Sequence, residues 1–319
     1  MIQDWKLFRK DTAFSTRSLV WYTIILTAVS GIVSAMAGTI IGGGGNSFAE
    51  SVAGEASAIG MIAGVLVGVC CLLQMGRKTR EPIHIFKTTG KKMTIGSFMT
   101  ICVFIFMAQF IFTMVYSVAE MILNIAGLSM EVLADLASIG SDQGIFMMIY
   151  AGFVGPIVEE LVYRGFLLRQ FEKYGKLFAL IMTSVLFGIM HANPLQIIFG
   201  ILMGLLLGYI ALEYSIKWSI AVHIINNFVL GEGLQGIADL LPVGIGDWFI
   251  IGLFSIGFVL GIVILVLKRN VWIQWLRENK VSGELYWNAL TTPSALLFIG
   301  YNLFNGLSVM LIVLFPDMF

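Results

Sequence analysis

Charged and imidazole side chains occur inside two segments that are otherwise apolar. Glu159, Glu160 and Arg164 lie in the apolar stretch 144–170, and His191 lies at the end of the next stretch. Ionisable residues are expensive at membrane depth, so by default they indicate a functional site. A carboxylate that faces a histidine in a partly dry cavity can act as a general base toward water. Whether these side chains meet depends on the segments that carry them.

The composition is that of a helical membrane protein. Of the 319 residues, 58% are hydrophobic and 12% are charged, and the charged fraction is about half of what soluble domains usually contain. The net charge of zero gives no reason to expect nucleic acid as a partner. We expect an all-α, polytopic transmembrane helical bundle with about eight or nine spans and a four-helix catalytic core. The expected spans cover about 19–41, 56–75, 95–123, 144–170, 177–192, 195–212, 218–231, 249–267 and 294–315.

These spans divide the chain into three regions. Residues 1–143 contain a basic lead-in (1–18) and spans 1–3, residues 144–231 contain the core with spans 4–7, and residues 232–319 contain spans 8–9. We expect the lead-in to lie on the membrane surface, because it alternates aromatic and basic residues. The first apolar run ends in a sequence that resembles a signal-peptide cleavage site, but its length favours a retained span.

Basic residues predict the orientation of the bundle. All 19 Lys and Arg residues fall in the N-terminal tail and in the segments 76–94, 164–176, 213–217 and 268–288, which include the last residues of span 4, and the alternate connections contain none. The positive-inside rule therefore places the N-terminus in the cytoplasm, and nine spans would place the C-terminus outside. We expect a multi-pass protein of a bacterial plasma membrane.

The polar residues of the core are expected to lie at similar depths. Glu159 and His191 are equally far from Gly175, the expected turn between spans 4 and 5. At 1.5 Å per residue both lie roughly 15 Å below the cytoplasmic boundary, and His223 lies roughly 12 Å below it. Glu160 and Arg164 are i,i+4 neighbours and should form an ion pair, whereas Glu159 is rotated about 100° from Glu160.

Each of these polar residues also has a purely structural interpretation. The Glu160–Arg164 pair could serve packing alone, and each histidine could bond to backbone or to a neighbouring helix. Asn226 and Asn227 are of the type that commonly links helices in membranes. Two of the three histidines are expected at nearly the same depth as the carboxylate pair, which favours a functional site. The third, His84, lies in a basic loop and receives no role. Pro156 is expected to kink span 4 just before the glutamates.

Two chemistries fit such a cluster. A glutamate can activate water while His223 and Asn227 donate hydrogen bonds to the oxyanion. Alternatively, Glu159, His191 and His223 could hold a zinc ion with an open position for water. Spacing does not choose between them, but the absence of an HExxH motif disfavours a zincin-like protease.

Three short motifs resemble those of the CPBP family of intramembrane proteases. The family includes type II CAAX prenyl proteases and the bacteriocin-processing or self-immunity proteins of the Abi type. The resemblance covers about 145–230, and each motif is weak alone, whereas three in order within apolar segments are specific. The motifs are EExxxR at Glu159–Arg164, FxxxH at Phe187–His191 and HxxxN at His223–Asn227.

The resemblance implies a role for each matched residue. Glu159 would activate water together with His191. His223 and Asn227 would stabilise the oxyanion. Glu160 and Arg164 would support the site. The family's names leave open whether a metal takes part.

We therefore predict an intramembrane endopeptidase that hydrolyses a peptide bond by glutamate- and histidine-activated water. Its substrate would be a membrane-associated peptide or protein that enters from the membrane or the cytoplasmic side, such as a CAAX tail or a bacteriocin or pheromone precursor. No cofactor is required by this prediction, although Zn²⁺ or another divalent metal stays open. The alternative is a catalytically silent bacteriocin-immunity or regulatory scaffold. A transporter is disfavoured because no inverted repeat is visible.

Overall fold

The structure, a computed structural model, describes residues 4–41, 49–77, 83–87, 91–125, 144–242 and 244–314. The described residues form helices joined by turns and contain no strand, which confirms the predicted all-α class. Of the predicted connections at 42–55 and 124–143, residues 42–48 and 126–143 lie outside the described residues. In chain order the elements are α1 (Trp5–Ile41), α2 (Ala49–Gly76), α3 (Ile95–Ile125), α5 (Ile145–Ile149), η2 (Tyr150–Val154), α6 (Gly155–Glu160), η3 (Leu161–Leu167), α7 (Leu168–Glu172), α8 (Lys176–Met190), α9 (Pro194–Glu213), α10 (Ile216–Ile224), η4 (Ile225–Gly233), α11 (Leu234–Asp239), α12 (Ile245–Leu267), α13 (Arg269–Asn279), α14 (Gly283–Leu290) and α15 (Pro293–Leu314).

Within the described residues, seven helices are long and apolar enough to cross a membrane. They are α1, α2, α3, the run from α5 to α7, α9, α12 and α15. The chain is thus an integral, multi-pass membrane protein, as predicted. The other two predicted spans correspond to α8 and to α10 with η4. Because α8 has only 15 residues, it extends roughly 22 Å, which is less than the roughly 30 Å of a bilayer core.

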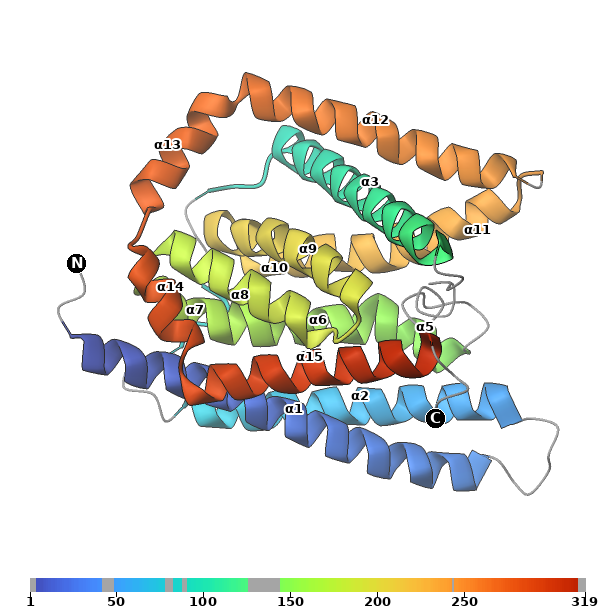
Figure 1. The fold of residues 1–319 in the computed structure, drawn as a ribbon, viewed down its shortest axis with the longest axis horizontal. Helices are drawn as coiled ribbons and strands as arrows, with labels where there is room; N and C mark the ends of the chain where they lie inside the picture. Colours follow the sequence, from blue (N-terminus) through green and yellow to red (C-terminus); the bar gives the residue numbers. More distant parts are fainter. Residues whose placement is uncertain are drawn as a thin grey trace.

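The helices form three layers (Figure 1). One outer layer contains α1, α2 and α15, and the other contains α3 and α12. The layer between them contains the run from α5 to α7 with α8, α9 and α10. In this arrangement α1 packs along α2, α3 along α12, and α8 along α9. All three predicted motifs therefore lie in the layer that the other two enclose.

The first helix differs from the prediction. The expected division between a lead-in at 1–18 and a first span at 19–41 is not seen in the described residues, because α1 runs without a break from Trp5 to Ile41. Phe8 is fully buried, with its ring 4.7 Å from that of Tyr174 and 5.6 Å from that of Phe178. These aromatic contacts hold the Phe8 side of the first turns of α1 against the end of the bundle.

Small residues bring α8 and α9 close together. A Cβ atom on Gly200 would lie 2.9 Å from Cα of Gly188, and one on Gly204 would lie 2.9 Å from Cα of Ser184. Gly200 and Gly204 thus form a close-packing face of α9, since a larger side chain there would separate the two helices. This contact holds the C-terminal end of α8, where His191 lies, against α9.

Predicted basic connections meet at one end of the bundle. Glu213, at the end of α9, accepts a hydrogen bond from Nζ of Lys176 at 2.9 Å and pairs with Lys91. The indole N–H of Trp275 also donates to Glu213 at 3.1 Å, which ties α13 to the same point. The segment 268–288, expected only as a basic connection, thus forms α13 and most of α14.

Candidate active site

The helix that carries the two glutamates widens into π-turns on both sides of α6. In η2 the N–H of Gly155 donates to the carbonyl of Tyr150, five residues back, in place of the usual partner four residues back. The next residue is Pro156, which has no N–H to donate and whose ring crowds the preceding turn. The predicted kink at Pro156 therefore takes the form of a π-turn, a feature that often occurs at functional sites.

Glu160 is the buried member of the pair. Its carboxylate is fully buried, and its Oε1 lies 2.9 Å from Nη1 of Arg164 and 3.0 Å from Nδ1 of His223. The hydroxyl of Ser219 contacts Oε2. The predicted i,i+4 ion pair is confirmed, and the structure adds two partners from α10. A buried carboxylate needs such compensation, because an isolated charge in an apolar interior is very unfavourable.

Arg164, the ion-pair partner of Glu160, makes contacts with two other helices. The guanidinium is fully buried, its Nη2 donates to the carbonyl of Gly204 at 3.3 Å, and its Cζ lies 4.3 Å from the centroid of the Phe187 ring. Cation–π contacts of this kind are strongest when the cation is desolvated. Arg164 thereby links the helix of the glutamates to both α8 and α9.

Glu159 is turned to a different side, as the rotation of about 100° per residue predicts. Its side chain is 20% exposed, and its Oε2 lies 3.7 Å from Nε2 of His223. The phenols of Tyr22, Tyr150 and Tyr163 lie near enough to interact with its charge. The imidazole of His223 is thus placed between the two carboxylates, bonded to Glu160 and facing Glu159.

His191 lies just beyond the last turn of α8. Its Nδ1 is 2.9 Å from the carbonyl oxygen of Phe187, and the Phe187 ring lies 5.0 Å from its own ring. Because a carbonyl only accepts, Nδ1 carries the proton, and in the neutral ring Nε2 then has the lone pair. His191 and Glu159 make no direct hydrogen bond among the described residues, so their joint action stays a prediction. The Phe187 ring also lies 5.9 Å from the ring of His223, so one aromatic ring contacts both histidines.

Asn227 joins the HxxxN helix to the helix of the glutamates. Its Nδ2 donates to the carbonyl of Ala151 at 3.1 Å, and its Oδ1 accepts from Nδ2 of Asn226 at 2.9 Å. Asn226 in turn accepts from Nε2 of Gln109 at 3.2 Å. The interhelical bonding expected of these asparagines therefore exists, and it leaves one of the two N–H groups of Asn227 uncommitted by these bonds.

The residues suggested as zinc ligands do not form a ligand cluster. No group of three or more His, Cys, Asp or Glu side chains among the described residues is placed to hold a metal ion. Nδ1 of His191 is bonded to the backbone of its own helix and Nδ1 of His223 to Glu160, so only Nε2 of each ring would be available to a metal ion. The arrangement of Glu159, His191 and His223 thus does not fit a tetrahedral zinc site.

Several residues of the site were not identified from the sequence. Ser219 contacts Glu160 across 59 positions of the chain, and Gln109 contacts Asn226 across 117. A signal for Gln109 does exist, because it is an amide in the middle of the apolar run that forms α3. Polar side chains at such a position usually bond to another helix.

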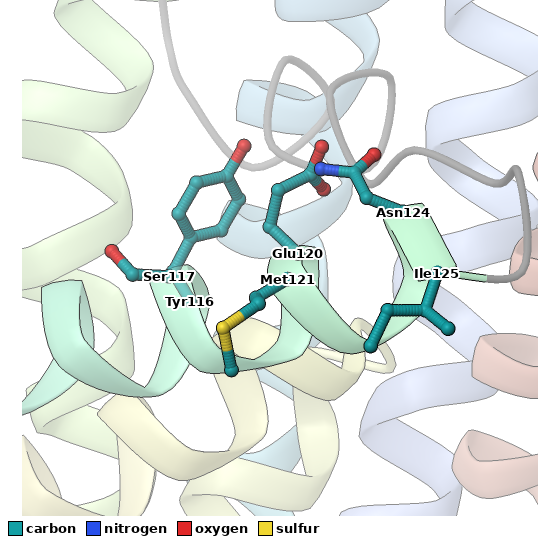
Figure 2. A pocket seen from close by; sticks show the side chains of 6 residues that line it. All are labelled: Tyr116, Ser117, Glu120, Met121, Asn124 and Ile125. Carbon is teal, nitrogen blue, oxygen red and sulfur yellow. The ribbon is translucent and has the colours of Figure 1, made fainter.

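A separate depression lies at the far end of α3 (Figure 2). Tyr116, Glu120 and Asn124 project from one side of the helix there. None of the predicted site residues lines this depression, so it is distinct from the Glu159–His223 cluster. Its lining consists of Tyr116, Ser117, Glu120, Met121, Asn124 and Ile125.

Comparison with known proteins identifies the same segment. Residues 141–229 match the family described as type II CAAX prenyl endopeptidase Rce1-like. The chain is also 31% identical over 98 residues to the protein named "Putative membrane peptidase YdiL" of Bacillus subtilis (strain 168). That alignment covers 30% of this chain and 40% of YdiL. No solved structure gives a significant match.

The matched segment contains all six predicted site residues, together with η2, η3 and the first part of η4. The predicted resemblance to CPBP proteases is therefore confirmed over this segment. Through its middle layer the chain is similar to the type II CAAX prenyl endopeptidases of the CPBP family.

Proposed function

We propose that this protein is an intramembrane endopeptidase that hydrolyses a peptide bond of a membrane-associated peptide or protein. The proposal rests on one observation: the adjacent carboxylates of Glu159 and Glu160 differ in burial and in hydrogen bonding. Glu160 is fully buried and bonded on both oxygens, whereas Glu159 is partly exposed and faces His223. Pairs of titratable groups placed in different environments are typical of acid–base catalysis.

In the proposed reaction Glu159 is the general base. It takes a proton from water while the water oxygen attacks the carbonyl carbon of the scissile peptide bond. The same proton then passes to the leaving amine as the C–N bond breaks, which restores the carboxylate. His191 assists with Nε2, which has a free lone pair because Nδ1 is held by the Phe187 carbonyl.

His223 and Asn227 stabilise the oxyanion in this proposal. Asn227 offers the N–H that is not donated to Ala151, and His223 offers Nε2. Because Nδ1 of His223 already donates to Glu160, the role requires the doubly protonated ring. Donors of this kind commonly contribute factors of roughly 100 to 1,000 in rate. Glu160, Arg164 and Ser219 act through His223 by fixing its position.

The substrate would reach the site from the membrane or the cytoplasmic side, given the charge-based orientation. A prenylated CAAX-type tail and a bacteriocin or pheromone precursor are both membrane-associated peptides that fit such an entry. The resemblance of residues 141–229 to CAAX prenyl endopeptidases supports the first as the initial probe.

The test uses purified protein reconstituted in liposomes. We would offer three quenched fluorescent peptides: a farnesylated CAAX peptide, the same peptide without lipid, and a peptide that inserts across the bilayer. Fragments are identified by mass spectrometry. Glu159→Gln should lower cleavage at least about 100-fold while the thermal unfolding midpoint stays unchanged. Glu284→Gln is the matched control, since Glu284 is an exposed carboxylate on α14, outside the site.

Full activity in correctly folded Glu159→Gln would disprove the assigned role of that residue. A wild-type protein that cleaves none of the three peptides would favour the silent scaffold, in which the same residues serve packing.

A further inference from the structure

We propose that Gln109 of α3 is a positioning residue for Asn227, through a directed chain of amide hydrogen bonds. The inference rests on the proposed function, because it assigns a second role within the same site. We call the chain Gln109–Asn226–Asn227–Ala151 the amide relay. It connects an outer layer of the bundle with the helix of the glutamates.

Every bond of the amide relay points the same way. Nε2 of Gln109 donates to Oδ1 of Asn226 at 3.2 Å, and Nδ2 of Asn226 donates to Oδ1 of Asn227 at 2.9 Å. Nδ2 of Asn227 then donates to the carbonyl oxygen of Ala151 at 3.1 Å. All three distances lie in the range of ordinary hydrogen bonds. The three amides therefore form one continuous path from α3 to η2.

The last acceptor of the relay, the carbonyl oxygen of Ala151, is available to Asn227 because of the π-turn and Pro156. In an α-helix the carbonyl of Ala151 would accept from the N–H of Gly155, but that N–H donates to Tyr150. In a continued π-helix the partner would be the residue five positions on. That residue is Pro156, which has no N–H. The α-helical and the π-helical donor are thus both unavailable to the Ala151 carbonyl, and Asn227 supplies a donor instead.

This acceptor fixes the polarity of the whole relay. A carbonyl oxygen can only accept, so Asn227 must present Nδ2 to Ala151 and Oδ1 to Asn226. Asn226 must then present Nδ2 to Asn227, and its Oδ1 requires a donor, which Gln109 provides. A rotated amide at any step would place two donors or two acceptors face to face. The relay consequently keeps the second N–H of Asn227 in one orientation, as the oxyanion role requires.

The position of Gln109 supports a specific role for it. Residue 109 lies halfway along the apolar helix α3, where an amide has no water partner to replace a lost bond. Asn226 is only 5% exposed. Without Gln109, its Oδ1 would be a nearly buried acceptor with no donor, and the orientation of both asparagines would lose its constraint.

The experiment compares Gln109→Met with Thr113→Val in the reconstituted full chain. Gln109→Met removes the donor at similar size. Thr113→Val is the matched control, because the Thr113 hydroxyl, one turn further along α3, bonds only to the backbone of its own helix. Two quantities are measured: cleavage of the farnesylated CAAX peptide, and the side-chain amide NMR signals of ¹⁵N-asparagine-labelled protein, assigned with Asn227→Ala.

We expect Gln109→Met to shift or broaden the Asn227 side-chain signal and to lower kcat roughly 10- to 100-fold at unchanged KM. Thr113→Val should change neither. Gln109→Met combined with Asn227→Ala should be no slower than Asn227→Ala alone, because both changes remove the same donor.

An unmoved Asn227 signal in Gln109→Met would overturn the relay itself. A moved signal with wild-type kcat would overturn the positioning role. If the signal moves but Asn227→Ala cleaves as fast as the wild type, the relay is supported as structure, and the oxyanion role in the proposed function fails instead.

Discussion

Removal of Arg164 gives the most direct test of how the site is held together. Arg164→Met replaces the guanidinium with an apolar side chain of comparable length. It removes the ion pair to Glu160, the hydrogen bond to the Gly204 carbonyl and the contact with the Phe187 ring. Glu160 would keep its bonds to His223 and Ser219.

The expected loss of unfolding free energy follows from the burial of Glu160 and Arg164. Removing one partner of a buried ion pair typically costs about 3–5 kcal/mol, because the other charge stays buried without compensation. Since Glu160 retains two partners, we expect the lower end, about 3 kcal/mol of unfolding free energy. The double variant Glu160→Gln with Arg164→Met carries no uncompensated charge, so it should recover at least about 1 kcal/mol relative to Arg164→Met.

The measurement is equilibrium unfolding in mixed detergent micelles, followed by circular dichroism. Arg269→Met is the control, since Arg269 is exposed on α13. The double variant should not cleave peptide, because His223 loses the charge of its anchor, Glu160. A loss below about 1 kcal/mol in Arg164→Met, or a double variant that is no more stable than the single one, would refute the view that burial makes this pair indispensable.

Three further substitutions address the elements around the site. Pro156→Ala restores an N–H that can donate to the Ala151 carbonyl, so it should displace Asn227 and lower kcat, and wild-type kcat would contradict the role given to the proline. Glu55→Gln weakens the carboxylate cap that accepts from two backbone N–H groups of α5 at 2.9 and 3.0 Å, and should cost about 1 kcal/mol with faster hydrogen exchange there. Gly200→Val places methyl groups against Gly188 and should lower stability by about 1–3 kcal/mol in the same unfolding assay, whereas an unchanged midpoint would show that α8 and α9 can separate freely.

Much of the fold was predictable because the bilayer imposes simple requirements. Apolar runs located α3, α9 and α12 within a few residues, since a spanning segment must satisfy its backbone internally and expose apolar side chains. The predicted span at 56–75 missed the start of α2 at Ala49. The extent of α1 was missed because burial of Phe8 against Tyr174 and Phe178 depends on residues far along the chain. For the same reason α13 was not recognised: its anchor is the bond from Trp275 to Glu213.

The site was predictable where it depends on helical spacing alone. The i,i+4 relation gave the Glu160–Arg164 pair, and the rotation between neighbours separated Glu159 from it. Spacing could not reveal Ser219 or Gln109, because their bonds join different helices. Nor could it show that Nδ1 of His191 bonds to the Phe187 carbonyl, since that depends on where α8 ends.

The π-turns connect the fold with the candidate site. Among the described residues they occur in the helices of the EExxxR and HxxxN motifs, and the long outer helices contain none. Wider turns have poorer backbone hydrogen bonding, so the chain tolerates them where side chains compensate. Asn227 supplies the donor that Ala151 lacks, and Glu160 joins α6 to α10 through His223. The motif residues therefore stabilise the irregular backbone that presents them. It follows that a loss of cleavage in any motif variant supports catalysis only if the folded fraction is measured in the same sample.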